Sequence, residues 1–131
     1  MSRVGIVRMG PIFMNHNESD EQQALFQWAK LMQGQHPELS LLHSIPNGGK
    51  RNVIEAARMK REGVKAGVSD VFLPVARGKY HGLYIELKVG ENKTSSDQKW
   101  WIAQTTKQGY CSTVCYGWVE AKGVIEKYLE G

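Results

Sequence analysis

The chain has 131 residues, 41% of them hydrophobic, which suffices for one globular core and is too short for two domains of ordinary size. Its 17 lysines and arginines outnumber 13 aspartates and glutamates, so the formal charge of +4 and the isoelectric point of about 9.1 favour a polyanionic partner. The sequence contains neither an apolar run near the roughly 20 residues of a membrane helix nor a signal-peptide pattern, so we expect a cytoplasmic protein without membrane association.

The N-terminal residues 1–17 mix Gly, Pro, Met and Asn without a sustained period. This composition predicts a tail or an edge strand ahead of a single domain at residues 18–131. The first helix is predicted to begin at Ser19, because Ser19 and Gln22 match a capping box and apolar residues then recur at three- and four-residue spacing. Gly34 is expected to end this helix.

The rest of the chain alternates between strand and helix patterns. In order it predicts a strand, a helix, two strands joined as a hairpin, a helix, a strand and an amphipathic closing helix. The ranges are residues 39–45, 51–62, 70–75, 83–89, 96–107, 110–116 and a closing helix that contains 119–129. This alternation predicts the α/β class, with a mixed sheet flanked by helices.

The two cysteines, Cys111 and Cys115, fall on one predicted strand. Four residues of strand span roughly 13 Å, which exceeds the Cα separation that a disulfide tolerates. We therefore expect reduced thiols. The chain has no Cys or His cluster with zinc-site spacing, so a structural zinc is not expected.

The aromatic and imidazole side chains indicate no separate site. Trp28, Trp100 and Trp101 fall at helical positions, where core packing explains them better than base stacking. The four histidines show no ligand spacing, and only His43, near the turn at Asn47, could lie close to a site.

The predicted strand at residues 83–89 carries the most distinctive chemistry. Side chains alternate along a strand, so Glu86 and Lys88 share one face and lie about 6.7 Å apart. If the hairpin is symmetric about Lys79, Asp70 lies opposite Lys88 and diagonal to Glu86 on that same face. A register slip of one residue would move Asp70 to the other side of the sheet.

Two carboxylates that converge on a sheet surface suit a hard divalent cation such as Mg²⁺, which prefers oxygen ligands. Such a cation can polarise a phosphoryl oxygen and activate a water, while Lys88 orients that water or offsets charge on the phosphate, so a phosphodiester is the expected substrate. An exposed ion pair between Glu86 and Lys88, with Asp70 as a cap at the start of its strand, explains the same pattern. The apolar flanks, which are typical of a central strand, favour the metal site.

Two further polar residues could join this site. Glu21 lies in the first turn of the first helix, on or beside the face of Leu25 and Trp28 that packs inward. It is either a third carboxylate at the metal or a favourable charge at the helix N-terminus. Gln98 opens the helix that follows the Glu86 strand, and it is either a solvated surface residue or a contact to a phosphate or a water at the metal.

The basic charge is concentrated in residues 50–65, which contain six lysines and arginines but only two acidic residues, Glu55 and Glu62. This excess of positive charge equals the formal charge of the whole chain. The loop after this segment leads to Asp70, so a phosphate backbone could run from it into the site. A solvated helix face is the alternative. The DNA-binding residues that we predict are Asn47, Lys50, Arg51, Arg58, Lys60, Arg61 and Lys65.

Together these residues resemble the VRR-NUC domain, the virus-type replication-repair nuclease branch of the PD-(D/E)xK superfamily. The resemblance covers about residues 19–117, and the Pro-Asp of the superfamily is here Ser69-Asp70. The matching motifs, in order, are Glu21, SIPNGGKR at residues 44–51, GVSDVFLP at 67–74, YIELK at 84–88, and Gln98.

The resemblance implies a restriction-endonuclease-like α-β-β-β-α-β core and a phosphodiesterase that requires Mg²⁺ or Mn²⁺. It implies metal ligation by Glu21, Asp70, Glu86 and the carbonyl of Leu87, with Lys88 as the catalytic lysine and Gln98 as the helix glutamine.

Stand-alone members of the family look like viral proteins that act on branched or flap DNA, often as homodimers. The expected function is therefore a DNA endonuclease of replication, repair or recombination, in the host cytoplasm if the protein is viral. A nucleic-acid-binding or scaffold module that keeps the fold without turnover is one alternative. A hydrolase of RNA or nucleotides is another.

Overall fold

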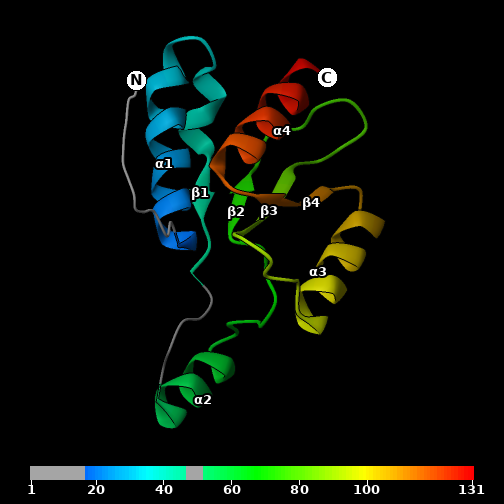
Figure 1. The fold of residues 1–131 in the computed structure, drawn as a ribbon. Coiled ribbons are helices and arrows are strands. Elements are labelled where there is room, and N and C mark those ends of the chain that lie inside the picture. Colours follow the sequence, from blue (N-terminus) through cyan, green and yellow to red (C-terminus); the bar gives the residue numbers. More distant parts are fainter. Residues whose placement is uncertain (1–16, 47–51) are drawn as a thin grey trace.

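The computed structural model describes residues 17–46 and 52–131, and within them a four-stranded sheet is flanked by helices (Figure 1). The order of elements along the chain is the predicted α-β-α-β-β-α-β-α, with two short 3-10 turns after the first helix. The elements are α1 (Glu18–Leu31), η1 (Met32–Gly34), η2 (Pro37–Leu41), β1 (His43–Ser44), α2 (Val53–Arg61), β2 (Val71–Leu73), β3 (Leu83–Lys88), α3 (Ser96–Lys107), β4 (Cys111–Tyr116) and α4 (Trp118–Glu130). The predicted tail at residues 1–17 lies outside the described residues apart from Asn17 and stays a prediction.

The sheet is mixed, as predicted, and its strand order is β1-β2-β3-β4. The β1/β2 and β2/β3 pairs are antiparallel, whereas β3 and β4 are parallel and α3 crosses between them. Strand β3 is therefore an inner strand, paired on both edges, and the predicted α/β class with a mixed sheet flanked by helices is confirmed. No helix in the described part of the chain is long and apolar enough to span a membrane.

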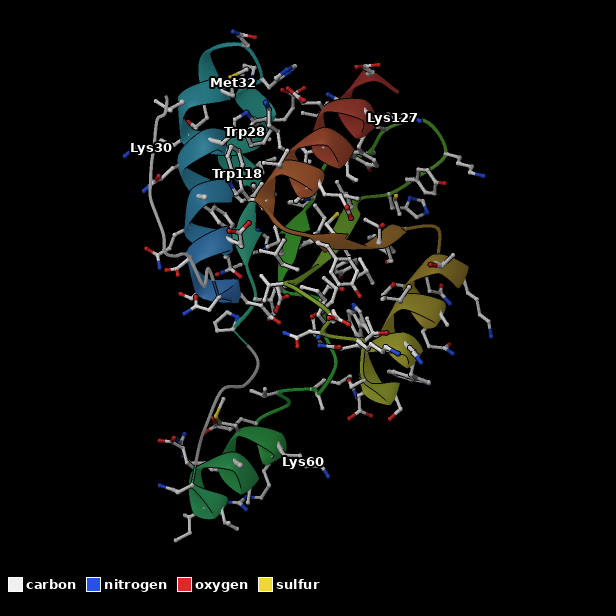
Figure 2. The ribbon with its side chains drawn as sticks, viewed as in Figure 1. Trp28, Lys30, Met32, Lys60, Trp118 and Lys127 are labelled. Carbon is white, nitrogen blue, oxygen red and sulfur yellow. The ribbon has the colours of Figure 1, made fainter. Side chains whose placement is uncertain are left out.

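The core lies between the sheet and the pair α1 and α4 (Figure 1). Leu83, Ile85 and Leu87 point from β3 into this core, where α1 contributes Leu25 and α4 contributes Ile125, and all five are buried. Trp28 of α1 and Trp118 of α4, labelled in Figure 2, pack against the same cluster.

The opposite face of β3 carries Tyr84, Glu86 and Lys88 and is covered by α3. The ring of Trp101 meets Tyr84 edge-on, with the ring centroids 5.6 Å apart. Because both faces of β3 are covered, polar side chains placed on it are removed from bulk water. This is how Glu86 and Lys88 come to be buried.

The first helix begins earlier than predicted, because Asn17 and not Ser19 is its cap. The Asn17 side chain accepts a hydrogen bond from the Asp20 amide at 2.9 Å, and the Asp20 carboxylate accepts one from the Asn17 amide. Asparagine caps helices at least as well as serine, so the earlier capping box determines the start. At the other end the helix tightens into η1, which ends at the predicted Gly34.

The predicted strand at residues 39–45 is wrong for most of its length. Only His43 and Ser44 form β1, while Leu39 to Leu41 belong to the 3-10 turn η2. Pro37 opens that turn, and its fixed φ angle favours the first position of a helical turn. Leu39 and Leu42 are thus buried, but Leu39 lies in the 3-10 turn η2 and Leu42 directly follows it, and neither is in a strand.

Helix α2 differs from the other helices because it extends away from the sheet (Figure 1). None of its residues is buried, and Val53 and Ile54 at its start are 85% and 82% exposed. Asn52 caps the helix by accepting a hydrogen bond from the Glu55 amide at 2.7 Å. Its last turn is basic, as predicted.

The expectation of core packing for the tryptophans is wrong for Trp100, whose side chain is 51% exposed. Consecutive residues of a helix point about 100° apart, so Trp100 and Trp101 cannot both face the sheet. Trp101 takes the inward position against Tyr84. The cysteines match the prediction: Cys111 and Cys115 are free thiols on β4, and burial raises the pKa of Cys115 to about 12.

Candidate active site

The register of the β2/β3 hairpin decides whether Asp70 reaches the face of Glu86. Val71 pairs with Ile85 and Leu73 with Leu83. One step further along this register, Asp70 falls opposite Glu86 and not opposite Lys88 as predicted. The pairs are symmetric about Gly78, which adopts a positive φ of 54°, and not about Lys79. The difference is two residues, so Asp70 keeps the predicted face.

Asp70 is held between the strands on both sides of it. Its backbone carbonyl accepts a hydrogen bond from the Ile45 amide at 2.8 Å, next to β1. Its side-chain Oδ2 accepts one from the Leu87 amide of β3, also at 2.8 Å. The carboxylate therefore accepts a hydrogen bond from a backbone amide of the sheet, and this bond limits the rotation of the Asp70 side chain.

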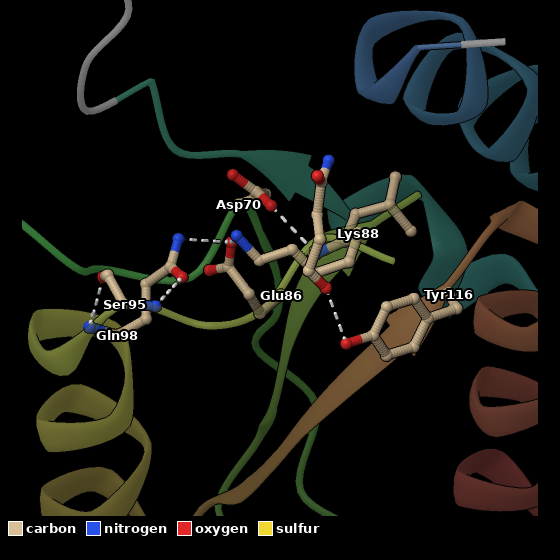
Figure 3. A network of polar contacts seen from close by, with 8 residues as sticks. Asp70, Glu86, Lys88, Ser95, Gln98 and Tyr116 are labelled. Carbon is tan, nitrogen blue, oxygen red and sulfur yellow. Dashed lines mark hydrogen bonds and ion pairs between the residues drawn. The ribbon is translucent and has the colours of Figure 1, made fainter. Parts of the chain in front are cut away.

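Glu86 is 1% exposed and lies at the centre of the polar network in Figure 3. Its Oε2 accepts a hydrogen bond of 2.8 Å from the Gln98 side-chain amide, and the Lys88 ammonium lies 3.9 Å from the same oxygen. Its other oxygen, Oε1, is buried and accepts no hydrogen bond from the described residues. A buried carboxylate oxygen without a donor is costly, and a bound cation would satisfy it.

Burial is the largest cause that raises the pKa of Glu86, and the negative charge of the neighbouring Asp70 acts in the same direction, so that the pKa reaches about 8. Lys88 acts in the opposite sense but does not cancel these effects. The site thus has a deficit of positive charge when both carboxylates are ionised.

The donor set fits a hard divalent cation. Asp70 and Glu86 offer carboxylate oxygens, one of which is buried without a hydrogen-bond donor among the described residues, and a cation would relieve the repulsion between the two carboxylates. Among the described residues, no group of three or more His, Cys, Asp or Glu side chains gathers closely enough to hold a metal. Two of the predicted carboxylate ligands therefore meet, and the ligand role of the Leu87 carbonyl stays a prediction.

Glu21 is engaged at the start of α4. Its Oε1 accepts a hydrogen bond of 2.9 Å from the Trp118 amide. Gly117 lies directly beside it, with a positive φ of 88°, and a Cβ there would come within 3.1 Å of Glu21 Oε1. The Gly117 amide in turn donates to the Lys88 carbonyl at the end of β3. Glu21 is thus connected to the Lys88 end of β3 through Gly117, and its ligand role stays a prediction.

Gln98 is positioned by a second capping box that the sequence analysis did not use. The Ser95 hydroxyl accepts a hydrogen bond from the Gln98 amide, and Gln98 Oε1 accepts one from the Ser95 amide at 2.9 Å. With Oε1 engaged in this way, the Nε2 of Gln98 is directed at Glu86 (Figure 3). The Ser-x-x-Gln pattern before the helix is the signal that could have identified this orientation.

Glu18, at the start of α1, was missed as a neighbour of the site. Its charge also raises the pKa of Glu86, so the first turn of α1 contributes to the electrostatic potential at the Glu86 carboxylate. Recognition of Asn17 as the cap would have placed Glu18 at the first helical position. His43, in contrast, packs edge-on against Phe72, and its Nδ1 lies 2.9 Å from the Leu41 carbonyl oxygen, which is a structural role.

The predicted DNA-binding residues fall into three groups. Asn47, Lys50 and Arg51 lie outside the described residues. Lys65 follows α2 in the loop toward Asp70, and its ammonium lies 5.8 Å from the centre of the Trp100 ring. The third group is on α2 itself and comprises Arg58, Lys60 and Arg61, of which Arg58 pairs with Glu62 at 3.2 Å.

Comparisons with known proteins agree with this geometry. The sequence matches the family described as the VRR-NUC domain over residues 11–118. A solved structure described as a "VRR_NUC domain protein" superimposes with a TM-score of 0.78 at 34% sequence identity, covering 90% of this chain and 92% of that one. No curated protein matches the chain.

Proposed function

Because the chain belongs to the VRR-NUC domain family, which has a nuclease-type fold, we propose that it is a metal-dependent DNA endonuclease. We assign its site to Asp70, Glu86, Lys88, Gln98 and Glu21. The observation that carries the proposal is that Asp70 and Glu86 lie together beside the buried Lys88, and that one Glu86 oxygen has no donor in the part of the chain that the structure describes.

Asp70 and Glu86 would hold Mg²⁺ or Mn²⁺, assisted by the Leu87 carbonyl and Glu21. Such an ion supplies polarisation of a phosphoryl oxygen and a lower pKa for a water at the site. The protein's own contribution is orientation. Gln98 occupies Oε2 of Glu86, which leaves Oε1 as the oxygen free to accept a ligand.

Lys88 supplies the positive charge of the site. Its ammonium lies 3.9 Å from Glu86 Oε2, and only 10% of its side chain is exposed. A buried ammonium in this position can donate to a phosphate oxygen or orient the attacking water, and either contact gains strength because water is excluded. This favours Lys88 as the residue that offsets charge on the scissile phosphate.

The DNA would approach from the basic side of the molecule. Lys65 lies in the loop that connects α2 to Asp70. The positive charge continues on α2 itself, with Arg58, Lys60 and Arg61. Asn47, Lys50 and Arg51 precede this helix in the sequence. Positive charge along one route to the site favours a phosphate backbone as the ligand.

We extend the proposal to branched, junction or flap DNA and to a homodimer in replication, repair or recombination. The support for a second copy is α2, which leaves Val53 and Ile54 exposed at its start. An isolated helix with two uncovered aliphatic side chains is a natural surface for self-association.

The test is cleavage of junction, flap, linear duplex and single-stranded DNA with Mg²⁺ or Mn²⁺. We expect cleavage that EDTA abolishes, and loss of it in Asp70→Asn and in Lys88→Ala. Lys127→Ala is the matched control, since Lys127 is exposed in the last turn of α4, whereas Lys88 lies next to the residue before the start of that helix, Gly117. Full activity of Asp70→Asn would rule out this site.

A second candidate is a DNA-binding module without turnover. It is favoured by Glu21, whose carboxylate caps α4 and does not complete a group of three ligands within the described residues. Salt-sensitive DNA binding without cleavage in either metal would support this candidate. RNA and free nucleotides in the same assay distinguish the third reading, an RNA-directed or nucleotide hydrolase.

A further inference from the structure

The outer face of α3 presents an aromatic ring to solvent close to the proposed site. Trp100 is 51% exposed, whereas Trp28, Trp101 and Trp118 are all partly covered by the protein. Tryptophan is the side chain that gains most from burial against another flat surface. The fold does not require an aromatic ring at this outward position, because the neighbouring Trp101 already fills the inward one.

A cation lies over this ring. The Lys65 ammonium is 5.8 Å from the centre of the Trp100 ring, within the range of a cation–π contact. Lysine is joined to the backbone by a long flexible stem, so its ammonium can leave the ring at small cost when another group covers that face. The pair therefore combines a flat apolar surface with a positive charge that can move to a phosphate.

The positions of the two residues are fixed relative to the site. Gly67 adopts a φ of 90°, and a Cβ added to it would lie 2.4 Å from the Asp97 carbonyl oxygen. The loop that carries Lys65 is thus packed directly on the first turn of α3. This loop continues into Asp70, and the same turn of α3 carries Gln98, so both parts of the pair are anchored to residues of the site.

We propose that Trp100 and Lys65 form a stacking platform for an unpaired base of the DNA substrate. The inference rests on the proposed function and deepens it, because it assigns a binding site for one unpaired base of the DNA substrate. Bases in a duplex have both faces stacked, whereas an unpaired base has a free face for the Trp100 ring and a phosphate for Lys65.

The platform lies on the far side of α3 from Glu86. Gln98 and Trp100 are two residues apart, which turns their side chains about 200° from each other around the helix. A helix is about 10 Å across, and a stacked strand rises about 3.4 Å per nucleotide, so the bound base lies on the order of three nucleotides from the scissile phosphate. A DNA strand that runs from the site across the first turn of α3 would place a base at this distance, next to the Trp100 ring.

The test is equilibrium binding of fluorescent oligonucleotides in EDTA, so that no cleavage occurs. The probes are a dT 20-mer, a duplex with a dT flap and a blunt duplex of equal length. We expect Trp100→Ala to weaken binding of the 20-mer and the flap by about tenfold, the scale of one stacked base, and binding of the blunt duplex by less than twofold. Trp100→Phe should retain most of the affinity, because it keeps an aromatic face.

Leu31→Ala is the matched control, because it also removes a large exposed apolar side chain, here on α1. It should bind all three probes like the wild type. Lys65→Ala should weaken all three, since it removes a phosphate contact. Thermal melting of each variant checks that the fold is intact.

Equal losses for blunt duplex and single strand in Trp100→Ala would overturn the platform, as would unchanged affinity for the 20-mer. Because binding is measured without a metal, a failure of the nuclease proposal appears separately, as absence of cleavage in Mg²⁺ or Mn²⁺ with the binding difference intact. Absence of DNA binding by the wild-type protein would overturn both proposals.

Discussion

The side-chain amide of Gln98 donates a 2.8 Å hydrogen bond to Oε2 of Glu86 and so connects α3 with the central strand. This contact removes one of the two Glu86 oxygens from competition for a cation. The hydrogen bond restricts the orientation of the carboxylate, and Oε1 is the oxygen that accepts no hydrogen bond from the described residues. A residue that contacts neither metal nor substrate can thereby control how well the site is formed.

Replacement of Gln98 by alanine should therefore weaken the metal site. Residues that orient a ligand typically change metal affinity by about 10–100-fold, so we expect Gln98→Ala to need correspondingly more Mn²⁺ for half-maximal cleavage. The variant also loses one hydrogen bond of the Ser95 capping box, which costs on the order of 1 kcal/mol of stability. Metal titration of cleavage measures the first effect, and thermal melting the second.

Gln108→Ala is the control for this variant, since Gln108 is exposed at the other end of the same helix. It should leave the metal requirement unchanged. An unchanged requirement in Gln98→Ala as well would show that the hydrogen bond to Glu86 has no part in metal binding.

The raised pKa of Glu86 predicts a specific pH dependence for the metal-free protein. The pKa is about 8 in the folded state against an ordinary value of 4.5, so the folded protein retains a proton that the unfolded chain has released. The free energy of unfolding should therefore fall as the pH rises from about 5 to about 8. Urea unfolding in EDTA over this range measures the slope.

Glu86→Gln should flatten this slope, because a glutamine cannot titrate. Addition of Mn²⁺ to the wild type should raise stability most at the high end of the range, where the carboxylate is ionised and free to bind the ion. A slope that is the same in wild type and Glu86→Gln would contradict the assignment of this titration to Glu86.

Glu21 offers a test that separates its two roles. Glutamine at this position keeps an oxygen for the Trp118 amide but removes the charge, whereas alanine removes both. If Glu21 ligates the metal, as we propose, Glu21→Gln should melt within a few degrees of the wild type and yet lose most of its cleavage activity. Glu21→Ala should also lose about 1 kcal/mol of stability, the value of a helix cap.

Wild-type activity in Glu21→Gln together with a lower melting temperature in Glu21→Ala would assign this residue to the α4 cap alone. Glu120→Gln is a suitable control. Its carboxylate accepts from the Tyr116 amide at the same end of α4, and it is exposed.

The strongest sequence inference was the face shared by Asp70, Glu86 and Lys88. The predicted pairing of Asp70 with β3 is wrong by two residues, but the predicted face is correct. Side chains alternate along a strand with a period of two, so a shift of two residues returns them to the same face of the sheet. The contact of Gln98 with Ser95 can also be predicted from the sequence, since a capping box is a local pattern, whereas its contact with Glu86 cannot. The contact from Glu21 to Trp118 joins residues 97 positions apart, and no local pattern predicts it.

Elsewhere in the sequence, two local signals compete and the structure follows the less obvious one. Asn17 and Ser19 are both good caps, each is followed three residues later by a side chain that can complete a capping box, and the earlier of the two caps the helix. The apolar run at residues 39–42 resembles a strand, but Pro37 starts a helical turn before it. For Trp100, composition indicates burial, and only the packing of Trp101 determines that the ring points outward.

The basic end of α2 should bind DNA without regard to its branching. Lys60 and Arg61 are exposed and form no ion pair among the described residues, whereas Arg58 is paired with Glu62. The double variant Lys60→Ala, Arg61→Ala should weaken binding to all DNA probes alike and reduce the slope of log affinity against log salt by about 2. The double variant Lys122→Ala, Lys127→Ala on α4 is the control, and an equal change in slope there would indicate nonspecific charge alone.

The apolar start of α2 gives the prediction for the oligomeric state. Val53 and Ile54 are 85% and 82% exposed, and in a homodimer a second copy would cover them. Light scattering should then give twice the 14.8 kDa of the chain, and Val53→Ser with Ile54→Ser should return it to a monomer. These positions begin the helix, after the Asn52 cap, where serine is well tolerated. Leu31→Ser, which also replaces an exposed apolar residue, should leave the dimer intact. A monomeric wild type whose DNA affinity falls in the double serine variant would assign the pair to DNA contact instead.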